Sequence, residues 1–479
     1  MEPGAQLVAA LAASLRAEVI ATHISWVLLG DEFAWKIKKP VRLPFVDYAS
    51  LAARRHCCEE EVRLNRRLAP TLYLGVSRIT GNAQAPRLDG DGAAIEYAVR
   101  MRRFAPGALF SEQLAAGTLA PGQVDALAAL LADFHDRAPP AAPGSGWGTP
   151  EGRRRVALAA LDGAASMASA DEAGRLRRWI EAGSDALAPL WRSRLASGRV
   201  REGHGDLHLD NIVSLGGEVA AFDGIEFDAA LRWIDVIDDL AFAVMDFAAR
   251  GRRGFAWRLL NGWLDRTGDH AGVSALRLAA VYRALVRAQV ERLRGPARAP
   301  AVRRYLDAAL AWTRPTPPGL IITHGLPGSG KTFQSQRLLE QRGAIRLRSD
   351  VERKRLFGLP MLGASRARGL DLYTADATRR TYEHLQATAR PLLAGGWPVI
   401  LDAAFLRRDE RAAARALADE LRVPFAILDC RAPPEVLRER LLARRGDASE
   451  ADVAVLERLQ ALAEPLAPQE QSLVCPATG

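Results

Sequence analysis

Residues 325–332 read GLPGSGKT, namely Gly325, Leu326, Pro327, Gly328, Ser329, Gly330, Lys331 and Thr332. The stretch fits the pattern in which two glycines separated by four residues precede Lys and then Ser or Thr. An apolar run, GLIITHG, comes before it, and a helical pattern that ends at Gly343 comes after it. A glycine-rich turn between a strand and a helix directs backbone N–H groups and the positive end of the helix at one point, where phosphate groups bind. We therefore expect a nucleotide site in which Lys331 reaches the β- and γ-phosphates and the Thr332 hydroxyl binds Mg²⁺.

The residues after this loop alternate between strand and helix patterns. The strand-like runs are AIRLRSD, PVILDAAF and PFAILDC, and helical patterns lie between and after them. That alternation predicts an α/β domain with a doubly wound parallel sheet at residues 319–479. Prolines within residues 313–318 end the preceding helix and indicate a short, stiff linker. Residues 1–312 are then a separate domain.

Two acidic residues at predicted strand ends are candidates for chemistry in the second domain. Asp402 ends the run PVILD and is placed to bind a metal ion, although an Asp that caps the next turn is an alternative. Asp350 is expected to take the proton of an acceptor hydroxyl, with Arg353 one turn later holding an anionic group of the substrate. A Ser-Asp pair that caps a helix is the alternative for Asp350. No Glu follows Asp402, which favours phosphoryl transfer over work-coupled hydrolysis.

A basic stretch, LRERLLARR, lies near the end of the predicted parallel-sheet domain. Helical spacing brings some of its arginines to one face, as a lid that covers phosphates would need. A solvated basic helix face is an equally good interpretation. The arginines concerned are Arg438, Arg440, Arg444 and Arg445.

The strongest signal in the first domain is HGDLHLDN at residues 204–211. Asp206 and Asn211 are five residues apart, so one loop can place Asp206 at a substrate hydroxyl and Asn211 at a metal ion. Asp223 ends the strand-like run EVAAFD and is expected to bind the same Mg²⁺. This order and spacing are typical of a kinase catalytic loop and its metal-binding Asp, and a polar loop with an Asp turn is the alternative.

A strand upstream supplies a candidate partner for the nucleotide phosphates. Lys36 ends FAWK, which is similar to the V-A-I-K strand whose lysine pairs with the α- and β-phosphates. Lys38 lies on the same strand face and is a second candidate. Either lysine would form an ion pair with Glu60 or Glu61 of the next predicted helix, although a solvated helix face is the alternative for these acids. Lysine is rare in this arginine-rich chain, so the lysines that occur indicate positions where a compact ammonium group is needed.

The patterns of the first domain change along its length. Short strand-like runs, SWVLLG, EFAWKIKK, LYLGVSRIT and AIEYAVRM, occur before about residue 104, with a helix between the second and third. Amphipathic helical patterns dominate from about 105 to 312. We expect an α+β, bilobal domain with a small β-rich lobe, about 1–104, and a larger helical lobe, about 105–312.

With these motifs the first domain resembles the aminoglycoside phosphotransferase and choline-kinase-like branch of the kinase fold, which has HGDxHxxN where protein kinases have HRD. The element IDVIDDLAF resembles that branch's D-L-A element, and the resemblance implies that Asp239 braces the catalytic loop. The second domain resembles small P-loop kinases of the polynucleotide-kinase and gluconate-kinase-like group. The whole chain is similar to bacterial fusion proteins described as bifunctional aminoglycoside phosphotransferase-like/ATP-binding proteins, which implies ATP and Mg²⁺ as cofactors.

Composition limits the possible partners and compartment. The chain has 479 residues and a net charge of +9, without a block of like charge, which suits anionic small substrates at least as well as nucleic acid. Its four cysteines lack the spacing of a zinc site, and no apolar run is long enough to span a membrane. The start of the chain lacks the basic region of a signal peptide. We therefore expect a cytoplasmic protein without a membrane partner.

These observations predict an ATP-dependent phosphotransferase with two nucleotide sites that acts on hydroxyl groups of small molecules. The expected catalytic residues are Asp206 in the first site, and Lys331 and Asp350 in the second. The alternative is a P-loop kinase acting on nucleic-acid ends or sugar nucleotides, with the first domain as a regulatory or ATP-sensing module. The sequence has no evident combination of aromatic and basic residues on which bases would stack, so a nucleic-acid partner is less favoured.

Overall fold

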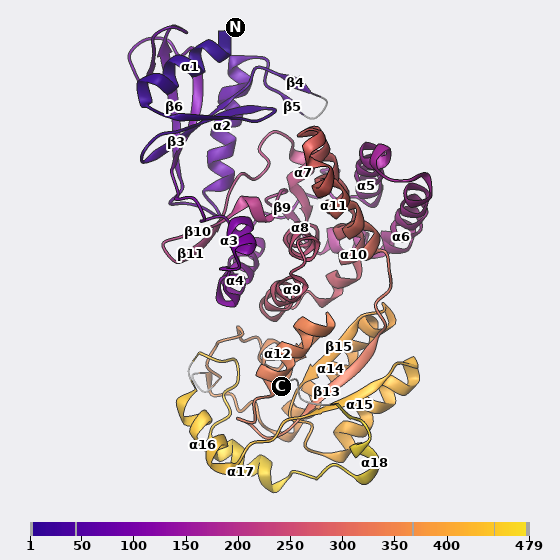
Figure 1. Cartoon of the computed structure of the whole chain (residues 1–479). Helices are drawn as coiled ribbons and strands as arrows, with labels where there is room; N and C mark the ends of the chain where they lie inside the picture. Colours follow the sequence, from indigo (N-terminus) through magenta and orange to yellow (C-terminus); the bar gives the residue numbers. More distant parts are fainter. Residues whose placement is uncertain (1–2, 44–45, 366–367, 445, 476–479) are drawn as a thin grey trace. The chain divides into compact units, whose positions relative to one another are not determined.

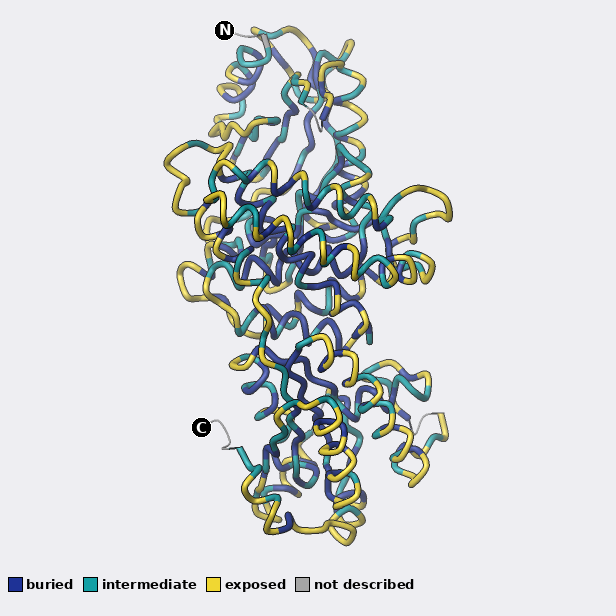
Figure 2. Tube along the Cα trace, turned by 90° about the vertical axis from the view of Figure 1, so that its right-hand side faces the viewer, coloured by how far each residue is buried: buried dark blue, intermediate teal, exposed yellow. Residues whose placement is uncertain are grey.

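The computed structural model describes residues 3–43, 46–365, 368–444 and 446–475. The chain forms two compact units, and each is made of two stretches of sequence (Figure 1). The first contains residues 1–155 and 188–243, and the second contains residues 156–187 and 244–479. Buried residues run through the interior of each unit, whereas outer helix faces and loops are exposed (Figure 2).

The first unit contains a six-stranded antiparallel sheet in the order β1-β2-β3-β8-β6-β7. It confirms the four predicted strands and adds β1 at one edge and the three-residue β7 at the other. The four residues of β1 are all exposed and so carried no alternating apolar signal. The bounds are β1 Glu18–Ala21, β2 Ser25–Leu29, β3 Phe33–Lys38, β6 Tyr73–Gly81, β7 Pro86–Leu88 and β8 Glu96–Arg102.

A helix packs on each face of this sheet. Helix α1 (Pro3–Leu15) packs on the face that carries Trp35 and Ile37, and α2 (Leu51–Asn65) packs on the face that carries Ala34. Side chains alternate along a strand, so Lys36 and Lys38 of β3 point toward α2. The short strands β4 (Arg42–Leu43) and β5 (Val46–Asp47) form a separate hairpin before α2.

The rest of the first unit is mainly helical and carries two short β-ladders around the HGDLHLDN loop. β9 pairs with β12, and β10 pairs with β11, so the loop begins after one ladder and ends at the other. The bounds are α3 Phe110–Ala116, α4 Pro121–Arg137, β9 Val200–Glu202, η2 Leu209–Asn211, β10 Ile212–Leu215, β11 Glu218–Ala221, α7 Ala229–Arg232, β12 Trp233–Asp235 and α8 Val236–Ala249.

The second unit combines several helices of the first sequence segment with a parallel sheet. In the sheet the order is β14-β15-β13-β16-β17, and all pairs are parallel, which confirms the predicted doubly wound α/β fold. Its strands are β13 Gly319–His324, β14 Ile345–Arg348, β15 Pro398–Asp402, β16 Phe425–Asp429 and β17 Val474–Cys475.

The helices of the second unit fall into two groups. Those before the sheet are α5 Pro150–Ala164, which starts in the first unit, α6 Ala170–Ala196, which ends in it, α9 Arg253–Thr267, α10 Val273–Leu293 and α11 Ala299–Trp312. Those that alternate with its strands are α12 Lys331–Arg342, α13 Ser349–Leu356, α14 Ala375–Ala394, α15 Arg408–Leu421, α16 Pro434–Ala443, α17 Val453–Ala461 and α18 Pro468–Gln471. Among the described residues, no helix combines the length and the apolar character needed to cross a bilayer.

Candidate active sites

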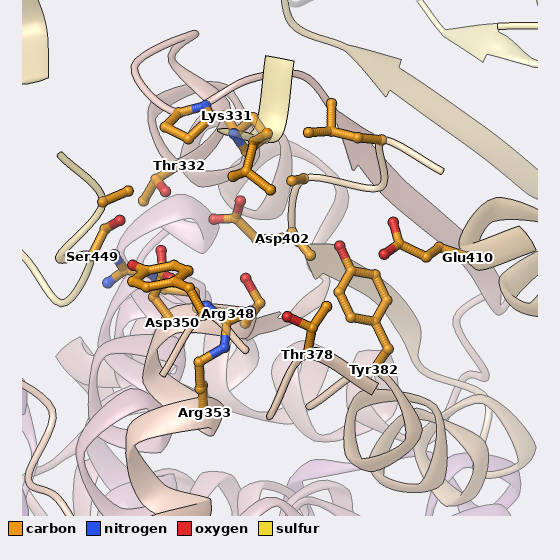
Figure 3. A pocket seen from close by; sticks show the side chains of 18 of the residues that line it. Lys331, Thr332, Arg348, Asp350, Arg353, Thr378, Tyr382, Asp402, Glu410 and Ser449 are labelled. Carbon is orange, nitrogen blue, oxygen red and sulfur yellow. The ribbon is translucent and has the colours of Figure 1, made fainter. Parts of the chain in front are cut away.

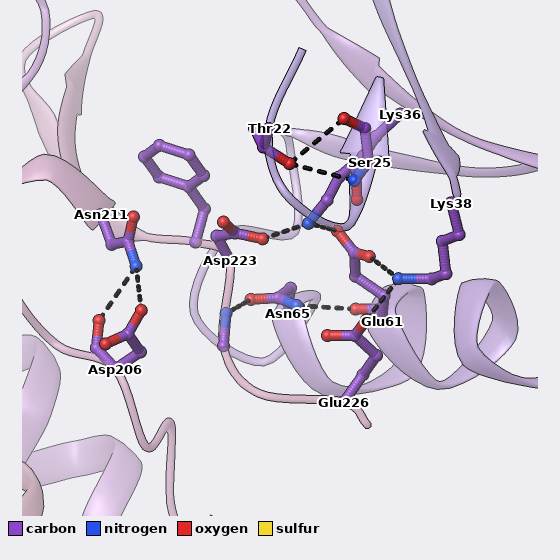
Figure 4. A network of polar contacts seen from close by, with 12 residues as sticks. Thr22, Ser25, Lys36, Lys38, Glu61, Asn65, Asp206, Asn211, Asp223 and Glu226 are labelled. Atoms are coloured by element: carbon purple, nitrogen blue, oxygen red, sulfur yellow. Dashed lines mark hydrogen bonds and ion pairs between the residues drawn. The ribbon is translucent and has the colours of Figure 1, made fainter. Parts of the chain in front are cut away.

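The loop at residues 204–211 brings Asp206 and Asn211 into contact. The Asn211 amide nitrogen donates to the main-chain oxygen of Asp206 at 3.0 Å and to its carboxylate at 3.2 Å (Figure 4). The His208 Nε2 atom lies 3.3 Å from the same carboxylate. The amide oxygen of Asn211 is not used in these contacts, and it is the type of ligand that Mg²⁺ takes.

Asp239 of α8 lies beneath this loop and holds its backbone. Its carboxylate accepts the N–H groups of His204 and Gly205, both at 2.9 Å, and a ring N–H of His135 at 3.2 Å. Burial alone would raise the pKa of Asp239, but these donors, His135 first, hold the pKa below its ordinary value. Asp239 therefore stabilises the backbone of the loop, as the family resemblance implied.

His204 fixes the start of the loop to the strand that leads to Asp223. Its Nε2 atom lies 2.9 Å from the Phe222 carbonyl, and its Nδ1 atom accepts the Asp206 N–H at 3.2 Å. Burial lowers the pKa of His204, which favours the neutral ring that this pair of contacts requires.

Asp223 has a left-handed backbone, with φ of 61°. Its N–H donates to the Tyr73 hydroxyl at 3.0 Å, and the next N–H, of Gly224, donates to the Asn65 side chain at 2.7 Å. These two contacts stabilise an uncommon conformation for a residue with a side chain. They turn the Asp223 carboxylate toward β3, where it forms an ion pair with Lys36.

Lys36 and Glu61 form the predicted lysine–glutamate pair, at 2.9 Å. Lys38 also pairs with Glu61, at 2.7 Å, so one carboxylate faces two ammonium groups (Figure 4). Burial would lower the pKa of Lys36, but Asp223 and Glu61 raise it well above its ordinary value. Of the two acids left open by the sequence, Glu60 instead pairs with Arg63 at 2.8 Å on the helix surface.

Two residues of this network, Glu226 and Tyr48, were not predicted from the sequence. Glu226, three residues after Asp223, forms a buried ion pair with Lys38 and accepts the hydroxyl of Tyr48. A signal was present, because the segment FDGIEFD carries a second acid close to Asp223. The Lys38–Glu226 pair connects β3 to the loop of Asp223.

The second site is a pocket of about 1330 Å³ beside the glycine-rich loop. Figure 3 shows Lys331 and Thr332 at one end and Tyr382 and Glu410 at another, with Asp402 between them. Five further predicted residues of this site also line the pocket, namely Pro327, Gly328, Gly330, Asp350 and Arg353, whereas Gly325, Leu326 and Ser329 of the same loop are not among its lining residues. The structure thus brings Lys331, Thr332, Asp350, Arg353 and Asp402 to one cavity.

The glycine-rich loop fits phosphate groups in three respects. Gly325 has φ of 144°, and a Cβ there would overlap the Cys430 carbonyl oxygen, so the turn requires glycine. The buried Ser329 hydroxyl has no hydrogen-bond partner among the described residues. Lys331 donates to the main-chain oxygens of Gly325 and Leu326 at 2.8 and 2.9 Å, and burial lowers the pKa of this lysine. An anionic ligand would supply the acceptor charge that these donors lack.

Asp402 ends β15 and is almost fully buried. One of its carboxylate oxygens accepts the hydroxyl of Ser335 at 3.0 Å. Ser335 lies one turn after Thr332 on α12, so Asp402 is close to the helix start where a magnesium ion would bind.

Asp350 and Arg353 form an ion pair at 3.2 Å on α13. The guanidinium group of Arg353 also lies over the Tyr373 ring, 5.0 Å from its centre. The N-cap of α13 is Arg348, without a side-chain capping bond, so neither Ser349 nor Asp350 is a helix cap. Asp350 therefore does not cap the start of the helix, and its side chain lines the pocket.

The basic stretch on α16 is divided between two environments. Arg440 donates to the Gly328 carbonyl at 3.0 Å, and Arg440 and Arg444 line the pocket. Arg438 instead lies 3.6 Å from Glu457, and Arg445 lies outside the described residues. The lid and the solvated-face interpretations thus each describe part of this helix.

Sequence reasoning missed the face of α14 that lines the pocket. Thr374, Thr378 and Tyr382 occur at intervals of four residues, which is a helical spacing and was the available signal. The Tyr382 hydroxyl accepts the Phe405 N–H at 3.0 Å, and burial raises the pKa of Tyr382. Burial also raises the pKa of Glu410, which lies opposite Tyr382.

Comparison with known proteins connects the two sites to two families. Residues 50–276 match a family model described as "Phosphotransferase enzyme family", and residues 320–466 match one described as "AAA domain". The matches fall within the two predicted domains and confirm the resemblance drawn from the motifs.

Several known proteins are similar to the chain over most of one or both segments. Uncharacterized proteins of Mycobacterium tuberculosis and Mycobacterium bovis are 32% identical over 453 residues, which is 93% of this chain and 89% of theirs. A choline kinase structure from Cryptosporidium parvum Iowa II is 8% identical, with a TM-score of 0.42, over 62% of this chain and 88% of that chain. A gluconokinase structure from Sinorhizobium meliloti 1021 is 23% identical, with a TM-score of 0.24, over 34% of this chain and 82% of that chain.

Proposed function

The chain belongs to the family of fusion proteins in which an aminoglycoside phosphotransferase-like domain precedes a P-loop kinase domain, and we propose its function from that premise. The protein is a kinase-type enzyme. In our proposal each domain binds ATP and transfers its γ-phosphoryl group to a hydroxyl of a small molecule.

In the first site, Asp206 orients the acceptor hydroxyl and takes its proton as the bond to phosphorus forms. Lys36, held by Glu61, contacts the phosphates of ATP, which compete with Asp223 for the ammonium group. The amide oxygen of Asn211 and the carboxylate of Asp223 would hold Mg²⁺, because hard oxygen ligands suit this ion. When bound, the ion neutralises charge on the transferred phosphoryl group.

In the second site, the backbone N–H groups of residues 325–332 and the Lys331 side chain hold the phosphates. The Thr332 hydroxyl and the Asp402 carboxylate are placed to hold Mg²⁺. Asp350, oriented by Arg353 at 3.2 Å, is the candidate base for the acceptor hydroxyl. Catalysis would come mainly from positioning and from charge already in place before the reaction.

The acceptor end of this pocket supports a small polar molecule as the substrate. The pocket lining includes hydroxyl, carboxylate and guanidinium groups, and Arg353 already has Asp350 as a partner. A polyhydroxylated acceptor would satisfy these groups without adding a large net charge. The use of ATP places both proposed reactions in the cytoplasm, where the four unpaired cysteines would also remain reduced.

One observation carries the proposal. Lys36, Glu61, Asp206, Asn211 and Asp223 come from four separate stretches of sequence and occur together in one unit, while a complete phosphate-binding loop occurs in the other. A domain that had lost its activity would not need all five residues to keep this arrangement.

The test follows transfer of label from γ-labelled ATP into a fractionated metabolite extract. We expect Asp206→Asn to abolish one set of labelled products and Lys331→Ala to abolish another. Lys39→Ala, which removes the lysine that follows directly after β3, is the matched control and should retain both sets. If Lys331→Ala abolishes all transfer and Asp206→Asn changes nothing, the first domain is an ATP-sensing module and the proposal of two kinases is wrong.

A further inference from the structure

Helix α9 is part of the phosphotransferase-matched segment, yet within the second unit it packs against the parallel sheet of the AAA-matched segment. β14 is the edge strand of that sheet. The buried Asn261 side chain accepts the Arg346 N–H at 2.7 Å and donates to the Ala344 carbonyl at 3.0 Å. One amide group thus replaces the backbone partners that an additional strand would supply at this edge.

Asp265 lies one helical turn after Asn261 and faces two arginines of the same strand. Its carboxylate is 3.5 Å from the Arg346 guanidinium and 3.6 Å from that of Arg348. The Asp265 side chain is 7% exposed, and those of the two arginines are 4% and 13% exposed. Little water can therefore solvate these charges, and the acid on α9 compensates them.

The two arginines extend from this contact to the P-loop site. Arg346 donates to the main-chain oxygen of Thr332 and to the Ser335 hydroxyl, both at 3.2 Å. Ser335 in turn donates to Asp402 at 3.0 Å. An acid on α9 is thereby connected, through one arginine and one serine, to the residues placed at the phosphates.

Arg348 takes a second route to the same pocket. It lines the cavity next to Asp350, and its guanidinium also pairs with Asp447 at 3.0 Å. The orientation of this side chain is thus set from two sides, by an acid on α9 and by an acid of the loop after α16.

We propose that Asp265 is a positioning residue of the P-loop site, so that α9 of the phosphotransferase-matched segment is a working part of the second kinase. The inference rests on the proposed function of that site. Asp265 is not among the residues that line the pocket, and it acts through Arg346 and Arg348. Its loss would let Arg346 release Thr332 and Ser335, and would shift the groups that hold the phosphates and the metal ion.

A second contact between α9 and the sheet domain allows a positioning role of Asp265 to be distinguished from simple attachment of α9 to the sheet. Arg258 of α9 pairs with Glu340 of α12 at 2.9 Å, and neither residue lines the pocket. If α9 only attached the helices to the sheet, loss of either contact would have a similar effect. A positioning role predicts that only the contact of Asp265 affects nucleotide binding.

The test measures Mg²⁺–ATP binding to the full-length protein by calorimetry. Lys331→Ala identifies which of the binding events belongs to the P-loop. We expect Asp265→Asn to weaken that event about tenfold or more, as loss of a group that orients a ligand-binding residue does. Asp265→Glu should restore most of the affinity, and Arg258→Gln, the matched control, should bind within about twofold of wild type.

The outcomes distinguish a failure of the proposed function from a failure of the positioning role alone. If Lys331→Ala changes no binding event, the P-loop binds no ATP, and both the proposed function and this inference fall. If Lys331→Ala removes an event that Asp265→Asn leaves unchanged, only the inference falls. Should Asp265→Asn fail to fold, Arg346→Lys replaces it, because it keeps the positive charge beside Asp265 but loses the forked contacts. Binding by that variant equal to wild type would overturn the positioning role.

Discussion

Replacing Glu61 by Gln is expected to destabilise the first unit and to disable its site. Glu61 is fully buried and pairs with Lys36 at 2.9 Å and with Lys38 at 2.7 Å. Gln keeps the size of the side chain and removes the charge that faces both ammonium groups. Asp223 and Glu226 then remain as the carboxylates of these two lysines.

The magnitude follows from the number of partners left. Removal of one member of a buried ion pair costs about 3–5 kcal/mol of unfolding free energy. Because each lysine keeps a second carboxylate, we expect the lower end of that range, which would lower the thermal midpoint by about 6–12 °C for a unit of this size. Phosphate transfer at the first site should fall about 100-fold, since Lys36 loses the group that orients it.

The assay compares urea unfolding of Glu61→Gln with that of Glu60→Gln. Glu60 is the adjacent residue and pairs with Arg63 on the helix surface, so its loss should cost at most about 1 kcal/mol. Initial rates of phosphate transfer are measured on the same two variants. If both lose the same stability within about 1 kcal/mol, Glu61 is not the shared counter-ion of the two lysines and the reasoning is refuted.

Three further predictions concern a residue in each of the two sites and a buried acid of α13. Asp239→Asn should slow phosphate transfer at the first site about tenfold or more in initial-rate assays, because Asp239 accepts two backbone N–H groups of the catalytic loop. Gly325→Ala should abolish ATP binding at the P-loop in calorimetry, because its Cβ would overlap the Cys430 carbonyl. Glu352→Gln should remove about 2–3 kcal/mol of unfolding free energy at neutral pH in urea titrations. Burial would raise the pKa of Glu352, but His384 and neighbouring charges lower it from 4.5 to about 2, so this stability is complete above pH 4.5 and is lost as the pH falls toward 2.

Each of these three substitutions has a control variant of the same type. Asp238→Asn changes the residue that directly precedes Asp239 and pairs with Arg153 at 2.6 Å, and it should leave transfer unchanged. Gly122→Ala adds a Cβ where no atom lies within 4 Å and should leave ATP binding intact. Glu383→Gln, beside His384 but exposed, should show no loss of stability. A Glu352→Gln protein with the same stability difference from wild type at pH 7 and pH 3 would contradict the assigned pKa direction.

Local motifs explain why much of each site could be predicted. A glycine-rich turn between a strand and a helix forms from adjacent residues, so residues 325–332 predict their own conformation and the class of ligand that we propose for them. The same holds for Asp206 and Asn211, which lie in one loop. Strand β1 was not predicted, because all its residues are exposed and its sequence has no alternation of apolar and polar residues that would indicate a strand.

Pairs that join distant residues could be predicted only in part. The sequence offered Glu60 and Glu61 as equal partners for a lysine, and the packing of α2 on the sheet selects Glu61 by burying it. Glu226 reaches Lys38 across 188 positions of the chain, and no spacing rule connects them. Such contacts depend on how helices pack on sheets, which the periodicity of one element does not contain.

The sequence by itself indicated the order of the two domains and the positions of the glycine-rich loop and of the HGDLHLDN loop, because each depends on adjacent residues or on the period of one element. Only the tertiary structure decided which carboxylate serves Lys36 and Lys38, which face of α14 lines the pocket, and that Asp265 of α9 faces the arginines of β14. The physical reason is that a buried charge must be compensated by whatever side chain the packing places beside it. That neighbour is fixed by the fold of the whole unit and not by its distance along the chain.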